Sequence, residues 1–226
     1  MTGQVPSPAE IENIPIFPLP NVVFFPHTLL PLHIFEPRYK QMIADALQGD
    51  RQIGMALLQP GWESRSSEGA KVFSTGGLGV ISEYKDLAEG KYDLLLSGRC
   101  RYRIIEFIQE TPYRIARVKL LSEVMPNRLE TTDISTELAL SFRELNEEDT
   151  YPELGMDVLE KLDFPTLVNS ICSSLNLSVY DKQQLLEMDS LKLRSTSILG
   201  ILRRLLAQKR VVSQFRHLQP KDPSVN

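Results

Sequence analysis

The chain has 226 residues, 42% of them hydrophobic and 24% charged, which is ordinary for a globular protein of one large or two small domains. No stretch approaches the roughly 20 apolar residues of a membrane-spanning helix, and the N-terminus lacks the pattern of a secretory signal. The formal net charge of −4 disfavours nucleic-acid binding, because phosphate contacts supply most of the affinity of such proteins.

The first part of the chain predicts short β elements and one helix. Residues 1–13 are expected to form a loose tail, and the following Ile14–His27 segment is rich in both β-forming residues and prolines. Because proline cannot donate to a sheet ladder, this composition favours short edge strands and turns. Leu32–Phe35 predicts another short strand. A helix is expected to begin at Pro37 and to be capped by Gly49.

A β-rich stretch then continues to Val124. Pro60–Gly69 is polar and rich in turn residues, so we expect an exposed loop there. Strands are predicted at Ile53–Leu58, Gly76–Tyr84, Tyr92–Ile108 and Tyr113–Leu121. The glycine of Ser97-Gly98 predicts a bulge in the longest of them. About six strands and one helix indicate a small, strongly bent sheet or barrel.

The periodicity becomes helical after Met125. Pro165 is placed to start one helix, Ser178 and Asp181 form a capping box for another, and a last helix is expected from about Ser190 to Arg216. This half should form a bundle of four or five helices.

Several segments together resemble the N-terminal, substrate-binding domain of Lon proteases. The opening match is Ile16–Pro26 with Leu30–Tyr39, a long run whose prolines make it specific. The later matches are Gly79–Glu83, Leu94–Arg99, Arg101–Ile104, Gln184–Glu187 and Leu191–Leu206. The resemblance therefore covers nearly the whole chain, in the same order.

This resemblance implies an α+β fold. A PUA-like β pseudobarrel is expected at residues 14–124, an all-α helical bundle at 125–216, and flexible tails at 1–13 and 217–226. It also implies a free-standing, non-catalytic module that binds unfolded or exposed polypeptide segments. In Lon proteases this region helps capture polypeptides for an ATPase and a peptidase; the chain ends where those modules would begin, so we expect neither activity.

The sequence shows no catalytic motif. Gly90-Lys91 is followed by Tyr92 and lacks the first glycine of a phosphate-binding loop, and Gly77-Leu-Gly79 lacks the third glycine of a dinucleotide fingerprint. We therefore predict no catalytic residues and no cofactor.

Metal and thiol chemistry are equally unsupported. The histidines are scattered, and Cys100 and Cys172 lie far apart in apolar surroundings, which predicts free thiols, no metal site and a cytoplasmic protein. His33 and Glu36 would point to opposite faces of a strand. We expect His33 to be packed or hydrogen-bonded, and Glu36 to cap the helix or pair with Arg38.

Aromatic residues offer candidate peptide-binding positions. Trp62, the only tryptophan, lies in the polar loop and either contacts ligands or covers the core as a lid. Phe24, Phe25 and Phe35 form a second possible surface, although aromatic residues in short strands usually belong to the core. The stretch Pro18–Pro31 could also offer a free strand edge to an extended peptide.

Two alternatives remain open. RNA binding would use Arg99, Arg101 and Arg103, which are expected to share a sheet face, with Arg114 and Arg117 on the next strand. The competing interpretation is a solvated face whose arginines pair with Glu83, Glu106 or Glu110. An adaptor for a protease or chaperone would instead dock through the helical half, where basic residues lie near the end of the last helix: Arg203, Arg204, Lys209 and Arg210. The helix dipole favours basic residues there without any partner.

Unfolded or extended polypeptide is thus the expected partner, with a protease or chaperone as a further one. Nucleic acid and membrane are not expected, and the sequence leaves the oligomeric state open.

Overall fold

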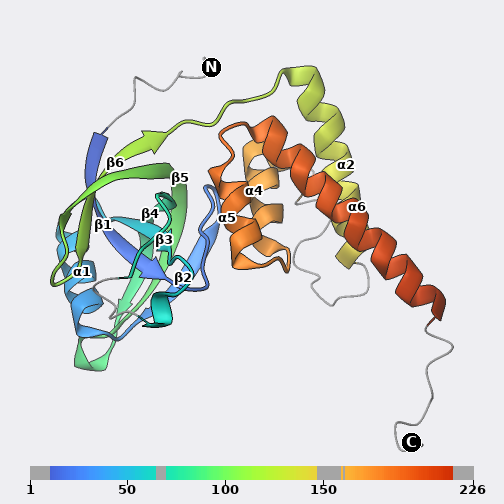
Figure 1. Cartoon of the computed structure of the whole chain (residues 1–226). Helices are drawn as coiled ribbons and strands as arrows, with labels where there is room; N and C mark the ends of the chain where they lie inside the picture. The colour runs from blue at the N-terminus through green and yellow to red at the C-terminus, as the bar shows by residue number, and fades with distance from the viewer. Residues whose placement is uncertain (1–10, 65–69, 147–158, 160, 216–226) are drawn as a thin grey trace, which may run out of the picture.

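The computed structural model describes residues 11–64, 70–146, 159 and 161–215 (Figure 1). Most of the two predicted tails and the end of the predicted 60–69 loop lie outside the described residues. The strands are β1 (Ile11–Leu19), β2 (Leu29–Ile34), β3 (Gln52–Leu57), β4 (Thr75–Asp86), β5 (Tyr92–Gln109) and β6 (Arg114–Leu121). The helices are α1 (Pro37–Gln48), α2 (Arg128–Asn146), α4 (Phe164–Ser174), α5 (Val179–Glu187) and α6 (Leu191–Phe215), with 3-10 turns η1 (Trp62–Ser64) and η2 (Ala88–Gly90).

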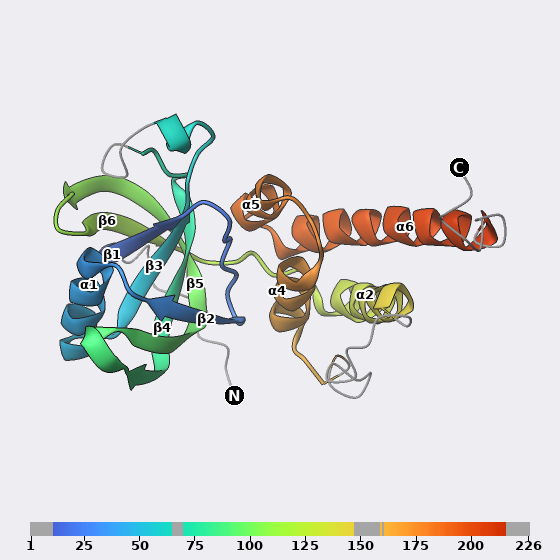
Figure 2. The same cartoon turned by 90° about the horizontal axis from the view of Figure 1, so that it is seen from below.

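The six strands form a barrel, which lies to one side of the later helices (Figures 1 and 2). Their order is β2–β5–β4–β3–β1–β6, and β5 also pairs with β6, so that the sheet closes on itself. All pairings are antiparallel except that of β1 with β3. The predicted α+β class, with a bent barrel before a helical half, is confirmed.

Strand β1 differs from the prediction of short edge strands, because it is one nine-residue strand with partners on both sides. It changes partner at Ile16: residues up to Ile16 pair with β6, and residues from Ile16 onward pair with β3. Pro15 lies one residue before the ladder with β3 begins, and Pro18 lies two residues after the ladder with β6 ends. A strand with two prolines can therefore be internal, since each missing N–H falls where a partner strand is absent.

The bulge predicted near Gly98 is confirmed. Gly79 pairs with Gly98 and Leu78 with Cys100, so Arg99 is the extra residue of β5. A Cβ at Gly98 would lie 2.4 Å from the backbone oxygen of Phe25. The glycine is thus required by the close approach of the segment before β2.

Two apolar clusters fill the β half. One lies inside the barrel around Tyr102, whose hydroxyl donates to the backbone oxygen of Met55 at 3.0 Å. The other lies where α1 packs on the strands through Tyr39, Met42 and Ile43. Helix α1 begins at Pro37 and is followed by Gly49 at its C-cap, as predicted.

Four α-helices in the described residues surround a separate third cluster. The Asp163 side chain accepts from the Thr166 N–H at the start of α4, and Ser178 does the same for Asp181 in α5. Ser178 thus caps α5 as predicted, and its hydroxyl donates to the Asp181 carboxylate at 2.7 Å. Phe25 also belongs to this cluster, so a residue from the predicted barrel range contributes to the core of the helical half.

Two buried arginines join the halves. Arg101 of β5 donates to Asp189 Oδ1 at 3.0 Å in the turn before α6. Arg194 of α6 contacts Glu123 at 2.5 Å and donates to Asn169 Oδ1 at 2.7 Å. Both guanidinium groups also donate to backbone carbonyls of the helical half. This network fixes the helices against the barrel wall.

Candidate functional site

Strand β2 presents an apolar row to solvent. Its residues alternate strictly: Leu30, Leu32 and Ile34 turn toward the cluster beneath α1, and the alternate residues are exposed. The exposed residues Leu29, Pro31, His33 and Phe35 make up what we call the β2 face. Leu29 is 64% exposed and Phe35 59%, and the His33 and Phe35 rings stack 6.0 Å apart.

The β2 face lies on an edge strand. Among the described strands, β2 pairs only with the first part of β5, and its other edge has no strand partner. His33 Nδ1 is hydrogen-bonded to Asp93 Oδ1 at 2.7 Å, which agrees with the hydrogen-bonded histidine that we expected. Glu36 and Arg38 form the predicted ion pair at 2.9 Å. The strand thus offers apolar side chains and open backbone groups at the same place, which are the two elements of peptide recognition by strand addition.

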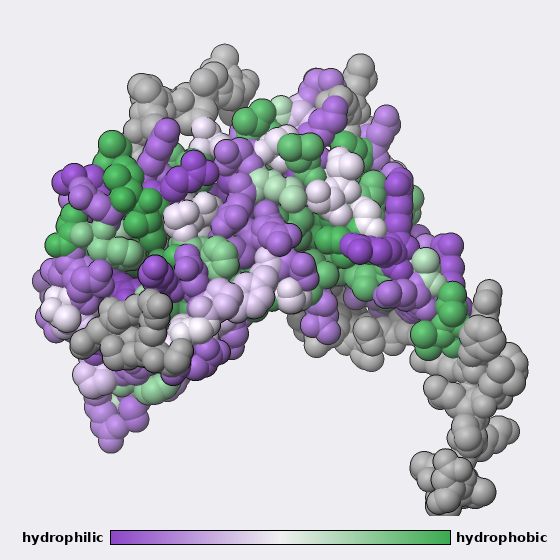
Figure 3. Space-filling view, viewed as in Figure 1, coloured by the Kyte–Doolittle hydropathy of each residue, from purple (hydrophilic) through white to green (hydrophobic). Residues whose placement is uncertain are grey.

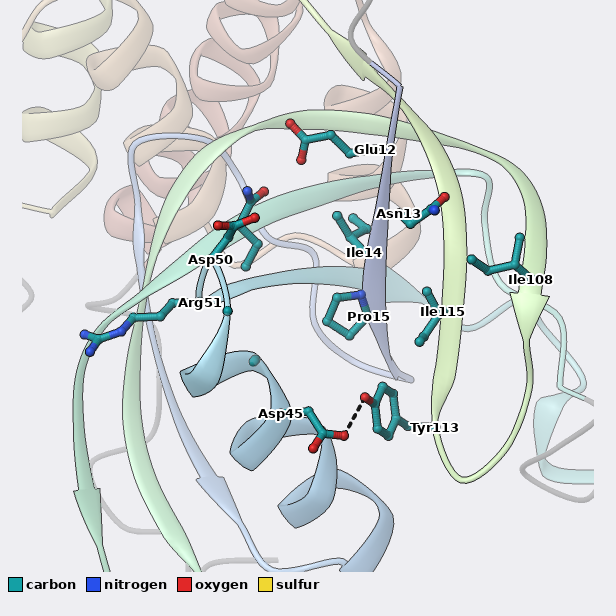
Figure 4. A pocket seen from close by; sticks show the side chains of 13 residues that line it. Glu12, Asn13, Ile14, Pro15, Asp45, Asp50, Arg51, Ile108, Tyr113 and Ile115 are labelled. Atoms are coloured by element: carbon teal, nitrogen blue, oxygen red, sulfur yellow. Dashed lines mark hydrogen bonds between the residues drawn. The ribbon is translucent and has the colours of Figure 1, made fainter.

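A groove of about 630 Å³ opens elsewhere on the barrel (Figure 4). It lies between the start of β1, the end of α1, the start of β3 and the β5–β6 hairpin. Its volume is in the range of small-molecule and peptide pockets. Its lining residues are Glu12, Asn13, Ile14, Pro15, Asp45, Ala46, Gly49, Asp50, Arg51, Gln52, Ile108, Tyr113 and Ile115. We refer to it as the β1 groove.

The charge of the β1 groove is acidic. Glu12, Asp45 and Asp50 line it, against the single basic residue Arg51, whose guanidinium lies 6.0 Å from the centre of the Tyr84 ring. Figure 4 shows the Arg51 side chain directed away from the other labelled residues. The negative end of the α1 dipole adds to the potential of the three carboxylates.

One hydrogen bond fixes the floor of the groove. The Tyr113 hydroxyl donates to Asp45 Oδ2 at 2.7 Å (Figure 4). Burial, followed by this hydrogen bond and the charge of Asp45, raises the pKa of Tyr113 to about 12. Tyr113 therefore remains a neutral donor throughout the physiological range.

The predicted aromatic positions divide between core and surface. Phe24 and Phe25 are buried, Phe25 completely, because they pack into the α1 cluster and the helical core. This corrects their assignment to a peptide-binding surface. Phe35 is exposed on the β2 face, and Trp62 is half-buried in η1. Contact of Phe35 and Trp62 with a ligand stays a prediction.

The five predicted arginines do not share one accessible face. Arg101 is fully buried under the helical half and Arg114 is almost buried, which corrects their assignment to an RNA-binding surface. Arg117 pairs with Glu106 at 2.5 Å and Arg114 with Glu110 at 3.1 Å. These ion pairs are those of the competing interpretation.

The other two arginines of that set are exposed, but they are not grouped with the rest. Arg99 is the bulged residue and lies 3.7 Å from Glu12, beside the β1 groove. Arg103 lies further along β5. Alternation along the strand could not reveal that a helix covers the position between them.

The basic residues at the end of α6 are engaged within the chain. Arg203 pairs with Glu137 and Arg210 with Glu144, while Lys209 donates to the backbone oxygen of Leu145 at 2.9 Å. All three contacts tie α6 to α2.

The described residues contain no group of three His, Cys, Asp or Glu side chains that could hold a metal ion. Cys100 and Cys172 are free, and burial raises the pKa of the first thiol to about 11 and of the second to about 12. Neither is an activated nucleophile. None of the helices in the described part of the chain is long and apolar enough to span a membrane.

Sequence reasoning missed most of the two candidate sites. Leu29 and Pro31 lie between the proline-rich Ile14–His27 segment and the strand predicted at Leu32–Phe35, and only the strict alternation from Leu29 to Phe35 could have signalled an exposed row. The stretch Pro18–Pro31, proposed as a free edge, overlaps this strand only at its end. The β1 groove is built from four distant segments, which no local pattern brings together. The exposed surface seen in Figure 3 carries apolar groups on both halves, mixed with hydrophilic ones.

The model of the ATP-dependent protease La (LON) substrate-binding domain family matches residues 13–204. Among curated proteins, the Lon protease of Anaeromyxobacter dehalogenans (strain 2CP-C) is 30% identical over 198 residues, which are 84% of this chain and 23% of that protein. Lon protease 2 of Myxococcus xanthus is 29% identical over 85% of this chain and 24% of its own length. The chain thus spans about a quarter of the length of these relatives.

Solved structures show the same fold. The N-terminal domain of the Mycobacterium avium complex Lon protease superimposes with a TM-score of 0.66 at 17% identity, covering 87% of this chain and 98% of that one. A Lon N-terminal domain protein from Xanthomonas campestris gives a TM-score of 0.61 at 20% identity, covering 84% and 98%.

Proposed function

The chain belongs to the family of LON substrate-binding domains, and from this premise we propose that it is a non-catalytic module that binds unfolded or exposed polypeptide segments through the β2 face. The matched region of the relatives is their substrate-binding domain, and about three quarters of their length lies outside the match. The binding role and the polypeptide ligand are therefore inferences for this chain.

The observation that carries the proposal is the exposed row Leu29, Pro31 and Phe35 on an edge strand. Large apolar side chains that alternate with core residues add nothing to the stability of the chain while they face water. On a partner they would supply apolar contact area, and the edge of β2 would supply main-chain hydrogen bonds. An unfolded polypeptide offers both counterparts without a defined shape.

A binding titration tests the proposal. The whole chain is titrated into a fluorescein-labelled protein that is permanently unfolded by reduction and carboxymethylation, and anisotropy is followed. We expect saturable binding that weakens at least tenfold in the double variant Leu29→Gln/Phe35→Gln, since two apolar contacts of an interface centre contribute about 1 kcal/mol or more each.

The matched control is Leu193→Gln/Val212→Gln on α6, whose two side chains are 63% and 60% exposed. It removes the same kind of exposed apolar surface and should leave the affinity unchanged. Absence of saturable binding, or equal loss in both double variants, would contradict a role for the β2 face.

The alternatives gain no specific support. The arginines predicted for RNA are buried, ion-paired or dispersed, and three of the four basic residues predicted for docking are bonded within the helical half.

A further inference from the structure

The N-terminal half of β1 has an open backbone edge. The Leu58 N–H donates to the Leu19 oxygen at 3.0 Å, so the odd-numbered residues of β1 direct their backbone groups toward β3. The β1–β3 ladder begins only at Ile16. The register Ile16↔Gly54 places the Pro15 oxygen on the Gly54 N–H, but none of the described strands pairs with the backbone of Asn13 on this side.

At the start of β3, the backbone of Gln52 faces this open edge and has no partner among the described strands on this side. The Ile81 N–H donates to the Arg51 oxygen at 2.8 Å, which shows that the odd-numbered residues here direct their backbone toward β4. By alternation, the backbone of Gln52 points toward β1, before the β1–β3 ladder begins. Two strand edges therefore flank the β1 groove, and the cavity of about 630 Å³ separates them.

The groove has the side-chain chemistry for an extended ligand. Ile108 and Ile115 supply apolar surface at one wall, while Glu12 and Asp50 supply charge near β1 and before β3 (Figure 4). The five residues Ile11–Pro15 span about 16 Å at the rise of a strand. That length accommodates a short strand of similar size.

We propose that the β1 groove binds an extended, basic segment of a polypeptide as an added strand along β1, with lysine or arginine side chains beside Asp50 and apolar ones on Ile108 and Ile115. Charge complementarity selects this occupant: three carboxylates and a helix C-terminus outweigh Arg51, which is directed outward, and Arg99, which lies 3.7 Å from Glu12. Pro15 removes one N–H from the edge, which limits pairing to short segments and hinders edge-to-edge aggregation.

This inference shares with the proposed function only the class of ligand. It predicts a second site with a different preference, for charge and backbone pairing, away from the apolar row of β2. Short peptides can test it without the unfolded protein that tests the β2 face.

The experiment uses two labelled eight-residue peptides, one alternating lysine and valine and one alternating glutamate and valine, titrated with the whole chain at low ionic strength. We expect the lysine peptide to bind at least tenfold more tightly and to weaken in 0.5 M salt. Asp50→Lys should weaken it about threefold to tenfold. The control Asp86→Lys makes the same charge change on an exposed residue at the end of β4 and should have no effect.

Two further measurements report on the backbone. Two peptides are methylated on alternate backbone nitrogens, one on the odd positions and one on the even positions, and one of the two should no longer bind. Hydrogen exchange at the amides of Asn13 and Gln52 should slow when the unmethylated peptide binds. Equal affinity for the two peptides, no binding of either, or a loss in Asp86→Lys as large as in Asp50→Lys would overturn the inference. None of these results would contradict the binding of unfolded protein to the β2 face.

Discussion

Gly98 shows that a single backbone position can determine how two distant segments pack together. Its predicted bulge follows from glycine in a long strand, but its role as the contact point for the Phe25 backbone does not, since Phe25 is 73 positions away in the chain. Arg101 is the opposite case: alternation placed it on the outer face correctly, yet the helices cover that part of the face. A local sequence pattern predicts the face to which a side chain points, whereas the burial of that side chain depends on which elements pack against the face.

Replacing Gly98 by alanine should destabilise the fold. The new Cβ would meet the Phe25 oxygen at 2.4 Å, which forces the segment before β2 to shift, so we expect a loss of about 1–3 kcal/mol in the free energy of unfolding by chemical denaturation. Gly200→Ala is the control, because its Cβ on α6 meets nothing within 4 Å. That variant should gain about 0.5–1 kcal/mol from helix propensity; similar effects of both variants would refute the steric explanation.

The Tyr113 hydroxyl gives a pH-dependent prediction. Its folded pKa of about 12 lies above the ordinary value of 10.0, so the protonated form stabilises the fold. This contribution is complete below pH 10 and is lost as the pH rises through 12. In a spectrophotometric titration, the difference between the wild type and Tyr113→Phe should show one phenol with a midpoint near pH 12. A midpoint near 10 would mean that the bond to Asp45 is not formed in solution.

At the scale of elements, the sequence predicted helices better than strand faces. Pro37, Gly49 and Ser178 are signals that act through the backbone of the same helix, and each was found where expected. Strand β1 was misjudged because its prolines are compatible with an internal strand only when its partners change at Ile16. The β2 face could be found only once Leu30, Leu32 and Ile34 were known to pack inward.

The cap of α4 should contribute measurably to stability. The Asp163 side chain accepts from the Thr166 N–H at 2.9 Å, and loss of such a cap costs about 1 kcal/mol. We expect this decrease in Asp163→Ala by urea denaturation. Asp133→Ala, an exposed aspartate within α2, is the control and should change the stability by less than about 0.5 kcal/mol. No difference between the variants would contradict the capping role.

At the scale of the whole molecule, the arginine network makes the barrel and the helices one unit. Arg101 bonds to the turn before α6, and Arg194 and Arg101 both lie within 3.6 Å of Glu123, which follows β6. The family resemblance predicted the two parts in order. Their mutual position depends on charges that no periodicity reveals.

Removal of one buried partner of this network should be costly. Arg101→Met leaves Asp189 and nearby carbonyl oxygens without their donor, so the free energy of unfolding should fall by about 3 kcal/mol. The neighbouring Arg99→Met removes a guanidinium that is 44% exposed and should cost less than about 1 kcal/mol. Chemical denaturation followed by tyrosine fluorescence measures both. Equal losses would show that the buried arginine network contributes no more to the free energy of unfolding than a surface ion pair does.

The most direct test of the central claim is site-specific photocrosslinking. A benzophenone amino acid replaces Phe35 in one form of the protein and Val212 in another, and each is irradiated with the carboxymethylated unfolded protein. We predict a crosslinked product from position 35 that unlabelled unfolded protein competes away, and little from position 212. No product at position 35, or equal products at both positions, would contradict polypeptide binding at the β2 face.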